Sequence, residues 1–348
     1  VFGDIDSPWL ILSIKFGESD FFRYLPLNKQ FFRTRHRKIV ELQARREYEG
    51  CGEYPSCTAE DYYAYRVALE TVPNLVGIQV WCQTGGWTRF QRLTFLDRSS
   101  IWNEINTWTS IRIFKDRLTP EEAVRQYAAT FLSPDQGAPL FELLQHSEAA
   151  IKMLLYVDDF ARRKLFFRRV RLPSIISVYW DRILVLPSVR KLLRCFVQDG
   201  ERAIRQGEEA LGRIDAMRDL AAEHDLPDMG IEFMQDTFAM LAKARLYYFQ
   251  PFNPGLMHSL QEDVQRYKQT YETRYTVRIS TSQFPLRTHQ MRWITGALLR
   301  SQRGYRPFDQ VVTIRILSVL YPLLNRIGRP YLPEFIQKQA MGLETIFK

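Results

Sequence analysis

The sequence lacks the segments that would carry it into or across a membrane. No stretch holds eighteen consecutive apolar residues, which is about the length that a bilayer-spanning helix needs. A basic-then-apolar secretory leader is also missing. We therefore expect a globular cytoplasmic protein with no membrane partner. The chain begins at Val1 rather than at a Met, so we also expect missing upstream sequence, and an export signal there stays open.

Cysteine and histidine are scarce, and neither is spaced for a metal. The four cysteines, Cys51, Cys57, Cys82 and Cys195, have neither the density nor the paired spacing of a disulfide framework or a zinc site. No two of the five histidines are three or four residues apart, so a helical metal pair is absent. We expect reduced structural thiols, no metal and no cofactor.

Positive charge exceeds negative charge by nine, and its densest source is "ARRKLFFRRVR", residues 161–171. Such a stretch could bind phosphate, a lipid surface or an acidic polymer. No recognised nucleic-acid motif accompanies it, and the stems of Arg and Lys commonly cover apolar helix surface. The sequence therefore favours an ordinary helix surface here and no nucleic-acid partner.

The first third of the chain alternates strand-like and helix-like runs. Short apolar runs at 9–16, 39–44 and 75–82 are bounded by turn residues, as buried parallel strands are. Between the second and third runs, Thr58 is placed to cap a helix with Asp61 at its third position. Helical spacing also continues through "SSIWNEINTWTSIRIFK". These patterns predict strand–helix–strand units.

From residue 117 onward nearly every pattern is helical. Thr119, Pro120 and Glu122 form a capping box with proline at the first helical position. The stretch 273–284 is the one that alternates like a strand. Pro and Gly breaks separate the expected helices, which run over 119–131, 139–156, 175–198, 200–224, 229–249, 256–277, 308–326 and 331–345.

Three strands cannot bury both faces of a parallel sheet or close a barrel by themselves. They must complete a larger sheet or belong to a barrel whose earlier strands lie upstream, and the start at Val1 favours the second. The expected fold class is therefore α/β plus all-α. We expect residues 1–116 to be the last strands of a (β/α)8 barrel and residues 117–348 to be a large helical domain.

Carboxylates stand in equivalent places after the first two strands. In a (β/α)8 barrel the catalytic groups lie just past the carboxyl ends of the strands. Asp20 and Glu47 follow the first and second runs closely, and Lys15 ends the first run. Trp81 and Trp87, around the loop after the third run, could form a flat apolar wall for a sugar ring.

Two blocks, "IKFGESDFFRYLPLNKQF" and "IVELQARREYEG", carry a family resemblance. They resemble the stretch of the α-glucuronidases of glycoside hydrolase family 67 that reads roughly I-K-x-G-x-x-D-F, then E-[FL]-Q-x-x-x-E-Y-x-G. A third block, "VGIQVWCQTGGWTRF", is similar to the family's final barrel strand and its Trp-bearing loop. The resemblance covers about residues 9–131 and is specific in order and spacing.

The resemblance implies a reaction and roles. Asp20 and Glu47 match the carboxylates that activate the attacking water in this inverting family, and Lys15 matches a lysine that contacts the carboxylate of the uronic acid. Inversion needs a base about 6.5–9.5 Å from the acid, so that a water fits between them. The expected activity is inverting hydrolysis of an α-glucuronosyl saccharide, as in xylan degradation, with an oligosaccharide as partner.

The sequence also departs from the family. The family's general acid belongs to an earlier strand, so this fragment alone is expected to be inactive. Arg45 and Arg46 directly precede Glu47, where they could pair with it, lower its pKa or bind an acidic substrate. We keep Arg46 and Trp87 as predicted substrate-binding residues.

Other acids and other functions stay open. Glu49 and Glu53 are lesser candidates for the base, Glu104 is expected on a helix surface, and Asp97 is expected in a loop or cap. The chain could serve a glycosidase for a different sugar. It could instead be a non-catalytic helical interaction or polysaccharide-binding protein with a degenerate barrel. The helical domain could form a homodimer.

Overall fold

The structure is a computed structural model of residues 1–348. Asp20, Glu47, Trp87, Asp97 and Cys195 lie outside the residues that it describes, as do the helices predicted at 308–326 and 331–345. The described residues are 5, 7–17, 21, 23–24, 26–46, 48–82, 100–156, 164–167, 170–173, 182–184, 190, 194, 197, 199–274, 278–280 and 299–300.

The three predicted strands form one parallel sheet. They are β1 (Ile11–Lys15), β2 (Arg37–Gln43) and β3 (Leu75–Trp81), hydrogen-bonded in the order β1-β2-β3. A short helix, α1 (Gln30–Arg33), precedes β2, and α2 (Ala59–Ala68) connects β2 to β3. The predicted strand–helix–strand unit is confirmed.

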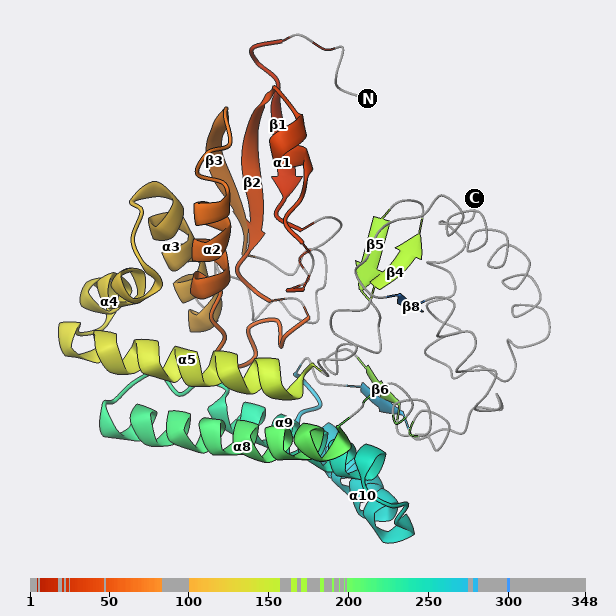
Figure 1. Ribbon diagram of the computed structural model, residues 1–348. Helices are drawn as coiled ribbons and strands as arrows, with labels where there is room; N and C mark the ends of the chain where they lie inside the picture. The colour runs from red at the N-terminus through yellow and green to blue at the C-terminus, as the bar shows by residue number, and fades with distance from the viewer. Residues whose placement is uncertain are drawn as a thin grey trace.

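The two faces of this sheet differ in chemistry because side chains alternate along a strand. On one face Ile14, Val40 and Leu42 are buried against Phe31 and Tyr62. The opposite face is partly exposed and is polar towards the carboxyl ends of the strands, where it carries Ser13, Lys15, Glu41, Gln79 and Trp81; Ile11 and Ile39 also lie on this face. Figure 1 shows α2 and the following helix α3 (Ile101–Lys115) beside the sheet. The apolar face therefore anchors the sheet.

Six longer helices build the rest of the described core. The capping box of Thr119 and Glu122 forms as predicted. In Figure 1, α5 and α8 run side by side below the sheet. The carboxyl ends of the strands point towards these two helices. The predicted helices in these regions are confirmed as α3 (Ile101–Lys115), α4 (Pro120–Phe131), α5 (Gly137–Leu154), α8 (Gly200–Glu223), α9 (Ile231–Phe249) and α10 (Pro254–Thr270), with a 3-10 turn η2 (Pro134–Gln136) before α5.

The helical core extends across residue 116. Tyr54, Cys57 and Trp102 pack in the same cluster as the buried side chains of α4, α5, α8 and α9. The indole nitrogen of Trp102 donates to the carbonyl of Met229, at 2.7 Å. Phe114 of α3 packs against both this cluster and the sheet cluster. The sheet therefore rests on the helices through α3 and through the loop that follows β2.

The helical expectation fails at two places after residue 156. Within the basic stretch, β4 (Lys164–Phe167) and β5 (Val170–Pro173) form an antiparallel pair, so the prediction of an ordinary helix surface there is wrong. The helix predicted over 175–198 is wrong at β6 (Arg182–Leu184).

Strands β4 and β5 pair locally, but β4 and β6 also have partners in distant segments. β6 pairs in parallel with β7 (Arg278–Ser280), which confirms the strand predicted there, and β4 also pairs with β8 (Leu299–Arg300). Such partners, roughly a hundred residues away along the chain, override local propensity.

The described residues thus form a mixed α/β structure with a three-stranded parallel sheet, a second sheet of three short strands and a two-stranded sheet. These strands do not close into a barrel. Among the described helices, none combines the length and the apolar character that crossing a bilayer requires.

Gly230 is the tightest junction between the helices and the loop after β2. Its φ is +86°, and a Cβ added there would lie 2.0 Å from the carbonyl oxygen of Glu53. We expect Gly230→Ala to lower the free energy of unfolding by roughly 2–4 kcal/mol in urea titrations, because strain and overlap add.

Gly212, within α8, is the matched control because a Cβ there meets nothing within 4 Å. Gly212→Ala should raise the free energy of unfolding by about 0.5–1 kcal/mol. Equal effects of the two substitutions would contradict the proposed junction.

Candidate functional site

The carboxyl ends of the three strands bring a lysine and an exposed tryptophan to one edge of the sheet. The ammonium of Lys15 lies 4.4 Å from the ring centroid of Phe21, in the loop after β1. That ring centroid lies 6.3 Å from the ring centroid of Trp81. Trp81 is 42% exposed. A cation and a flat apolar surface therefore lie on either side of Phe21 at this edge.

The polar face of the sheet continues from this edge. Ser13 donates to a carboxylate oxygen of Glu41 at 2.9 Å and to the amide oxygen of Gln79 at 3.4 Å. This polar row crosses all three strands. A parallel sheet buried on both faces would be apolar here, so the row suits a wet cleft or a polar ligand.

The loop after β2, residues 44–58, is buried and folded sharply; we call it the β2–α2 loop. Gly50 and Gly52 have positive φ, and so do Arg46 (φ 50°) and Cys51 (φ 52°). Left-handed backbone at a residue other than glycine costs about 1–2 kcal/mol. Such strain gathers at functional sites, where the surroundings hold it in place.

Side chains from two helices hold the β2–α2 loop. The carboxamide of Asn106, on α3, donates to the carbonyl of Ala44 and accepts from the amide of Thr58, both at 2.9 Å. Ser147, on α5, donates to the carbonyl of Pro55 at 2.5 Å. Buried backbone groups need such partners, so α3 and α5 determine the loop's shape.

An ion cluster lies beneath the edge; its members are Arg23, Arg46, Glu49, Asp61 and Glu148. Arg23 donates to both carboxylate oxygens of Glu49, at 2.6 and 2.8 Å, and also to Glu148. Arg46 donates to Asp61 at 2.8 Å. The ammonium of Lys152 lies 3.3 Å from Glu148, so three positive charges meet three negative ones.

Two carboxylates of the cluster, Glu49 and Asp61, have lowered pKa values. Burial alone would raise the pKa of Glu49, but the charges of Arg23 and Arg46 outweigh it and hold that pKa at about 2. The same balance holds the pKa of Asp61 at about 2. Removing one partner of a buried ion pair typically costs about 3–5 kcal/mol, because the other charge stays buried.

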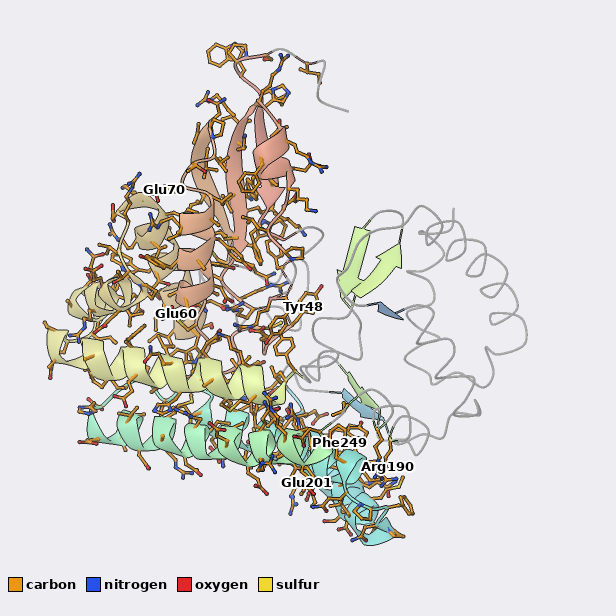
Figure 2. The ribbon with its side chains drawn as sticks, in the orientation of Figure 1. Tyr48, Glu60, Glu70, Arg190, Glu201 and Phe249 are labelled. Carbon is orange, nitrogen blue, oxygen red and sulfur yellow. The ribbon has the colours of Figure 1, made fainter. Side chains whose placement is uncertain are left out.

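The ion cluster joins the two loops that carry the predicted catalytic acids. Arg23 belongs to the loop after β1, in which Asp20 occurs, and Glu49 belongs to the β2–α2 loop, in which Glu47 occurs. Tyr156 donates its hydroxyl hydrogen to Glu49, and its ring packs edge-on against Tyr24 at 4.9 Å. In Figure 2, Tyr48, the neighbour of Glu47, lies between the sheet and the end of α5.

Three of the predicted acidic or basic residues are used inside the fold. Arg46 is 5% exposed and donates to Asp61 and to the carbonyl of Cys57. Because its guanidinium hydrogen-bonds within the ion cluster, we do not expect Arg46 to bind the substrate directly. Glu49 is fully paired with a low pKa, so it is a poor base. Glu53 is buried, with Arg274 at 3.9 Å.

Two further expectations have clear outcomes. Thr58 precedes α2 as predicted, but its side chain makes no capping hydrogen bond, and Asp61 turns to the ion cluster instead. Glu104 lies on α3 as expected, where it accepts from Tyr127.

The residues that hold the loops after β1 and β2 were not predicted from the sequence; they are Arg23, Asn106, Glu148 and Tyr156. One signal was present for α3. Polar residues at Asn103, Asn106, Thr107 and Ser110 repeat at helical spacing and are all buried, so they mark a polar face turned inward. No local pattern links Arg23 to Glu148, which are 125 residues apart.

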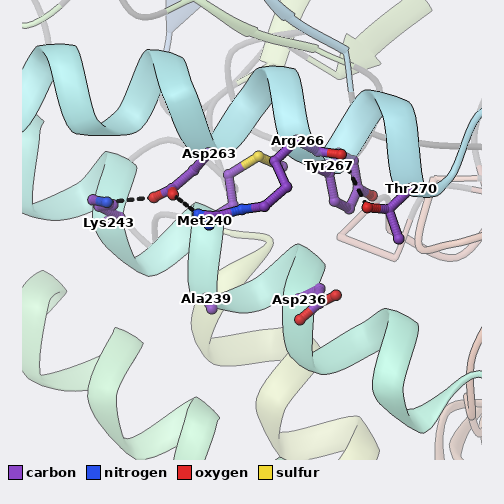
Figure 3. A pocket seen from close by; sticks show the side chains of 8 residues that line it. All are labelled: Asp236, Ala239, Met240, Lys243, Asp263, Arg266, Tyr267 and Thr270. Atoms are coloured by element: carbon purple, nitrogen blue, oxygen red, sulfur yellow. Dashed lines mark hydrogen bonds and ion pairs between the residues drawn. The ribbon is translucent and has the colours of Figure 1, made fainter.

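A separate hollow of about 440 Å³ lies between α9 and α10 (Figure 3). Asp263 accepts from both Lys243 and Arg266 there, so opposite charges already pair across it. None of the predicted site residues lines it. Across the described ranges, no group of three His, Cys, Asp or Glu side chains could hold a metal ion.

No known protein-family model matches this chain, and a search of curated proteins finds no match.

The ion cluster predicts how stability depends on pH. Because the pKa of Glu49 is held at about 2, below its ordinary 4.5, its pairing stabilises the fold fully above about pH 4.5. That contribution is lost as the pH falls towards 2. Glu49→Gln should therefore lower the urea midpoint at neutral pH and flatten its fall between about pH 5 and pH 2.

Glu142→Gln on α5 is the control, since the side chain of Glu142 is 60% exposed. We expect its midpoints to follow the wild type at every pH. Parallel curves for Glu49→Gln and the wild type would show that the cluster does not govern acid stability.

Proposed function

We propose that this chain forms part of an inverting glycoside hydrolase that acts on α-linked glucuronosyl saccharides. The described sheet would be the last three strands of a (β/α)8 barrel, and its polar face would line the barrel interior. One observation carries the proposal. The buried pair of Arg23 and Glu49 joins the loops after β1 and β2, beside the edge where Lys15 and Trp81 both lie near Phe21.

In this proposal Glu47 and Asp20 act on the attacking water. One carboxylate orients the water and the other accepts its proton as oxygen attacks the anomeric carbon. The leaving oxygen takes a proton from a general acid, which the family resemblance puts on an earlier strand. The separation of about 6.5–9.5 Å between acid and base leaves room for the water.

Lys15 and Trp81 would bind the sugar. An ammonium suits the C6 carboxylate of a uronic acid, because hydrogen bonds to charged groups are the stronger ones. The exposed indole of Trp81 offers a flat apolar wall for the ring, a role that Trp87 could share. Among the described residues, Cys51, Cys57 and Cys82 form no disulfide, which fits the expected cytoplasmic location.

A non-catalytic saccharide-binding protein is the competing function. It would use the same lysine and tryptophan but would not need a base. The full-length protein separates the two with glucuronosyl xylo-oligosaccharides: release of glucuronic acid supports the enzyme, and binding without release supports the binding protein.

Removing the proposed base should abolish turnover but keep binding. We expect Glu47→Ala to lower kcat by about 10²–10⁴-fold, the usual contribution of a general base. The measurement is glucuronic acid release, with saccharide affinity followed by calorimetry. Glu142→Ala, an exposed change on α5, should leave kcat alone. Unchanged turnover in Glu47→Ala would remove the proposed base.

Removing the charge of Lys15 should weaken selectivity for the acid sugar. Lys15→Met keeps an apolar stem over Phe21 while it deletes the ammonium. We expect kcat/KM for the glucuronoside, relative to its C6 methyl ester, to fall by about 10–100-fold. An equal loss for both substrates would indicate a neutral-sugar enzyme.

A further inference from the structure

Tyr156 lies where α5 ends, and it touches both loops of the candidate site. It is 1% exposed. Its hydroxyl donates to Glu49 in the β2–α2 loop, and its ring packs on Tyr24 in the loop after β1. One side chain of the helical core therefore contacts both loops. Its partner Glu49 is two residues from Glu47 in the sequence, and its partner Tyr24 is four residues from Asp20.

The backbone of Tyr156 is itself held firmly. Arg245, on α9, is fully buried and donates to the carbonyls of Tyr156 at 2.6 Å and Leu154 at 3.1 Å. It also donates to the carbonyl of Ala203 at 2.8 Å. The last carbonyls of a helix lack partners within it, so Arg245 satisfies them and links α5, α8 and α9 behind Tyr156.

The contact differs from the other anchors of the β2–α2 loop. Asn106 binds the backbone at the two ends of the loop, and Ser147 binds the carbonyl of Pro55. Tyr156 instead binds the side chain of Glu49, two residues from Glu47. Glu49 keeps both hydrogen bonds from Arg23 when the Tyr156 hydroxyl is deleted. The loss therefore leaves no buried charge without a partner.

We infer that Tyr156 is a positioning residue for the proposed glycosidase reaction. It acts through Glu49 and Tyr24 to hold the two loops that carry the water-activating carboxylates. The inference rests on the proposed function for its effect on catalysis. Its structural half, that Tyr156 holds these loops, can be measured without any substrate.

Tyr156→Phe should affect kcat more than KM. The ring stays on Tyr24, but the β2–α2 loop loses one restraint next to Glu47. Small misplacement of a reacting group can cost up to about 10²-fold in rate, so we expect kcat for the full-length protein to fall by about 5–50-fold with KM within about twofold. Tyr156→Leu, which also loses the ring contact, should reduce kcat further.

Hydrogen exchange supplies the readout that needs no substrate. In Tyr156→Phe the amides of residues 44–58 should exchange faster, while those of α8 and α9 keep wild-type protection. Tyr127→Phe is the matched control, because Tyr127 is also buried and also donates to a carboxylate, Glu104, at 3.2 Å. It should leave exchange in residues 44–58 and kcat unchanged.

The outcomes separate the two claims. If the wild type releases no glucuronic acid, the proposed function fails, and exchange in residues 44–58 still decides whether Tyr156 holds the loop. Unchanged exchange there in Tyr156→Phe overturns the inference. Equal acceleration throughout the chain also overturns it, since that is the result of general destabilisation. Faster exchange of the loop with unchanged kcat in an active enzyme overturns the catalytic half.

Discussion

The pairing of Arg23 with Glu49 and Glu148 is the interaction on which the candidate site depends. Buried charges are stable only when their partners surround them, and these partners come from separate parts of the chain. Arg23 follows β1, Glu49 follows β2, and Glu148 lies on α5. Each charge is satisfied only when both loops and the helix are in place, so the cluster selects one arrangement of the edge.

The rest of the structure supports that arrangement in layers. The apolar face of the sheet packs on Phe31 and Tyr62, which leaves the polar face and its row from Ser13 to Gln79 uncovered by that core. Below the edge, Asn106 and Ser147 satisfy the buried backbone of the β2–α2 loop. A strained loop held by side chains from two helices is a suitable support for a reactive carboxylate.

Hydrophobic periodicity and capping residues predicted the elements that depend on local sequence. The three strands, the capped start of α4 and the helices α5, α8, α9 and α10 follow from periodicity and capping residues. The end of β1 at Lys15 also brought that side chain to the expected edge. Strand β6 could not be predicted from a local pattern, because its partner β7 lies far along the chain. The β4–β5 pair is local, and its two short strands were missed.

The strand ends at Lys15 and Trp81 were predictable from the sequence, but the supports of the candidate site were not. Arg46 was expected to contact substrate, yet its left-handed backbone (φ 50°) accompanies a side chain paired with Asp61. Nothing in the sequence around Arg23 indicates Glu148, 125 residues away. Long-range pairing decides which charges face a ligand and which stay inside, and a single sequence does not record it.

The stereochemistry of the first product tests the central claim most directly. The full-length protein would be mixed with an α-linked glucuronosyl xylo-oligosaccharide and followed by proton NMR from the first minutes. In the proposed reaction, water activated by Glu47 and Asp20 would attack opposite the leaving group, so β-glucuronic acid should appear first and then mutarotate. Initial release of the α-anomer, or no release of glucuronic acid, would contradict the account.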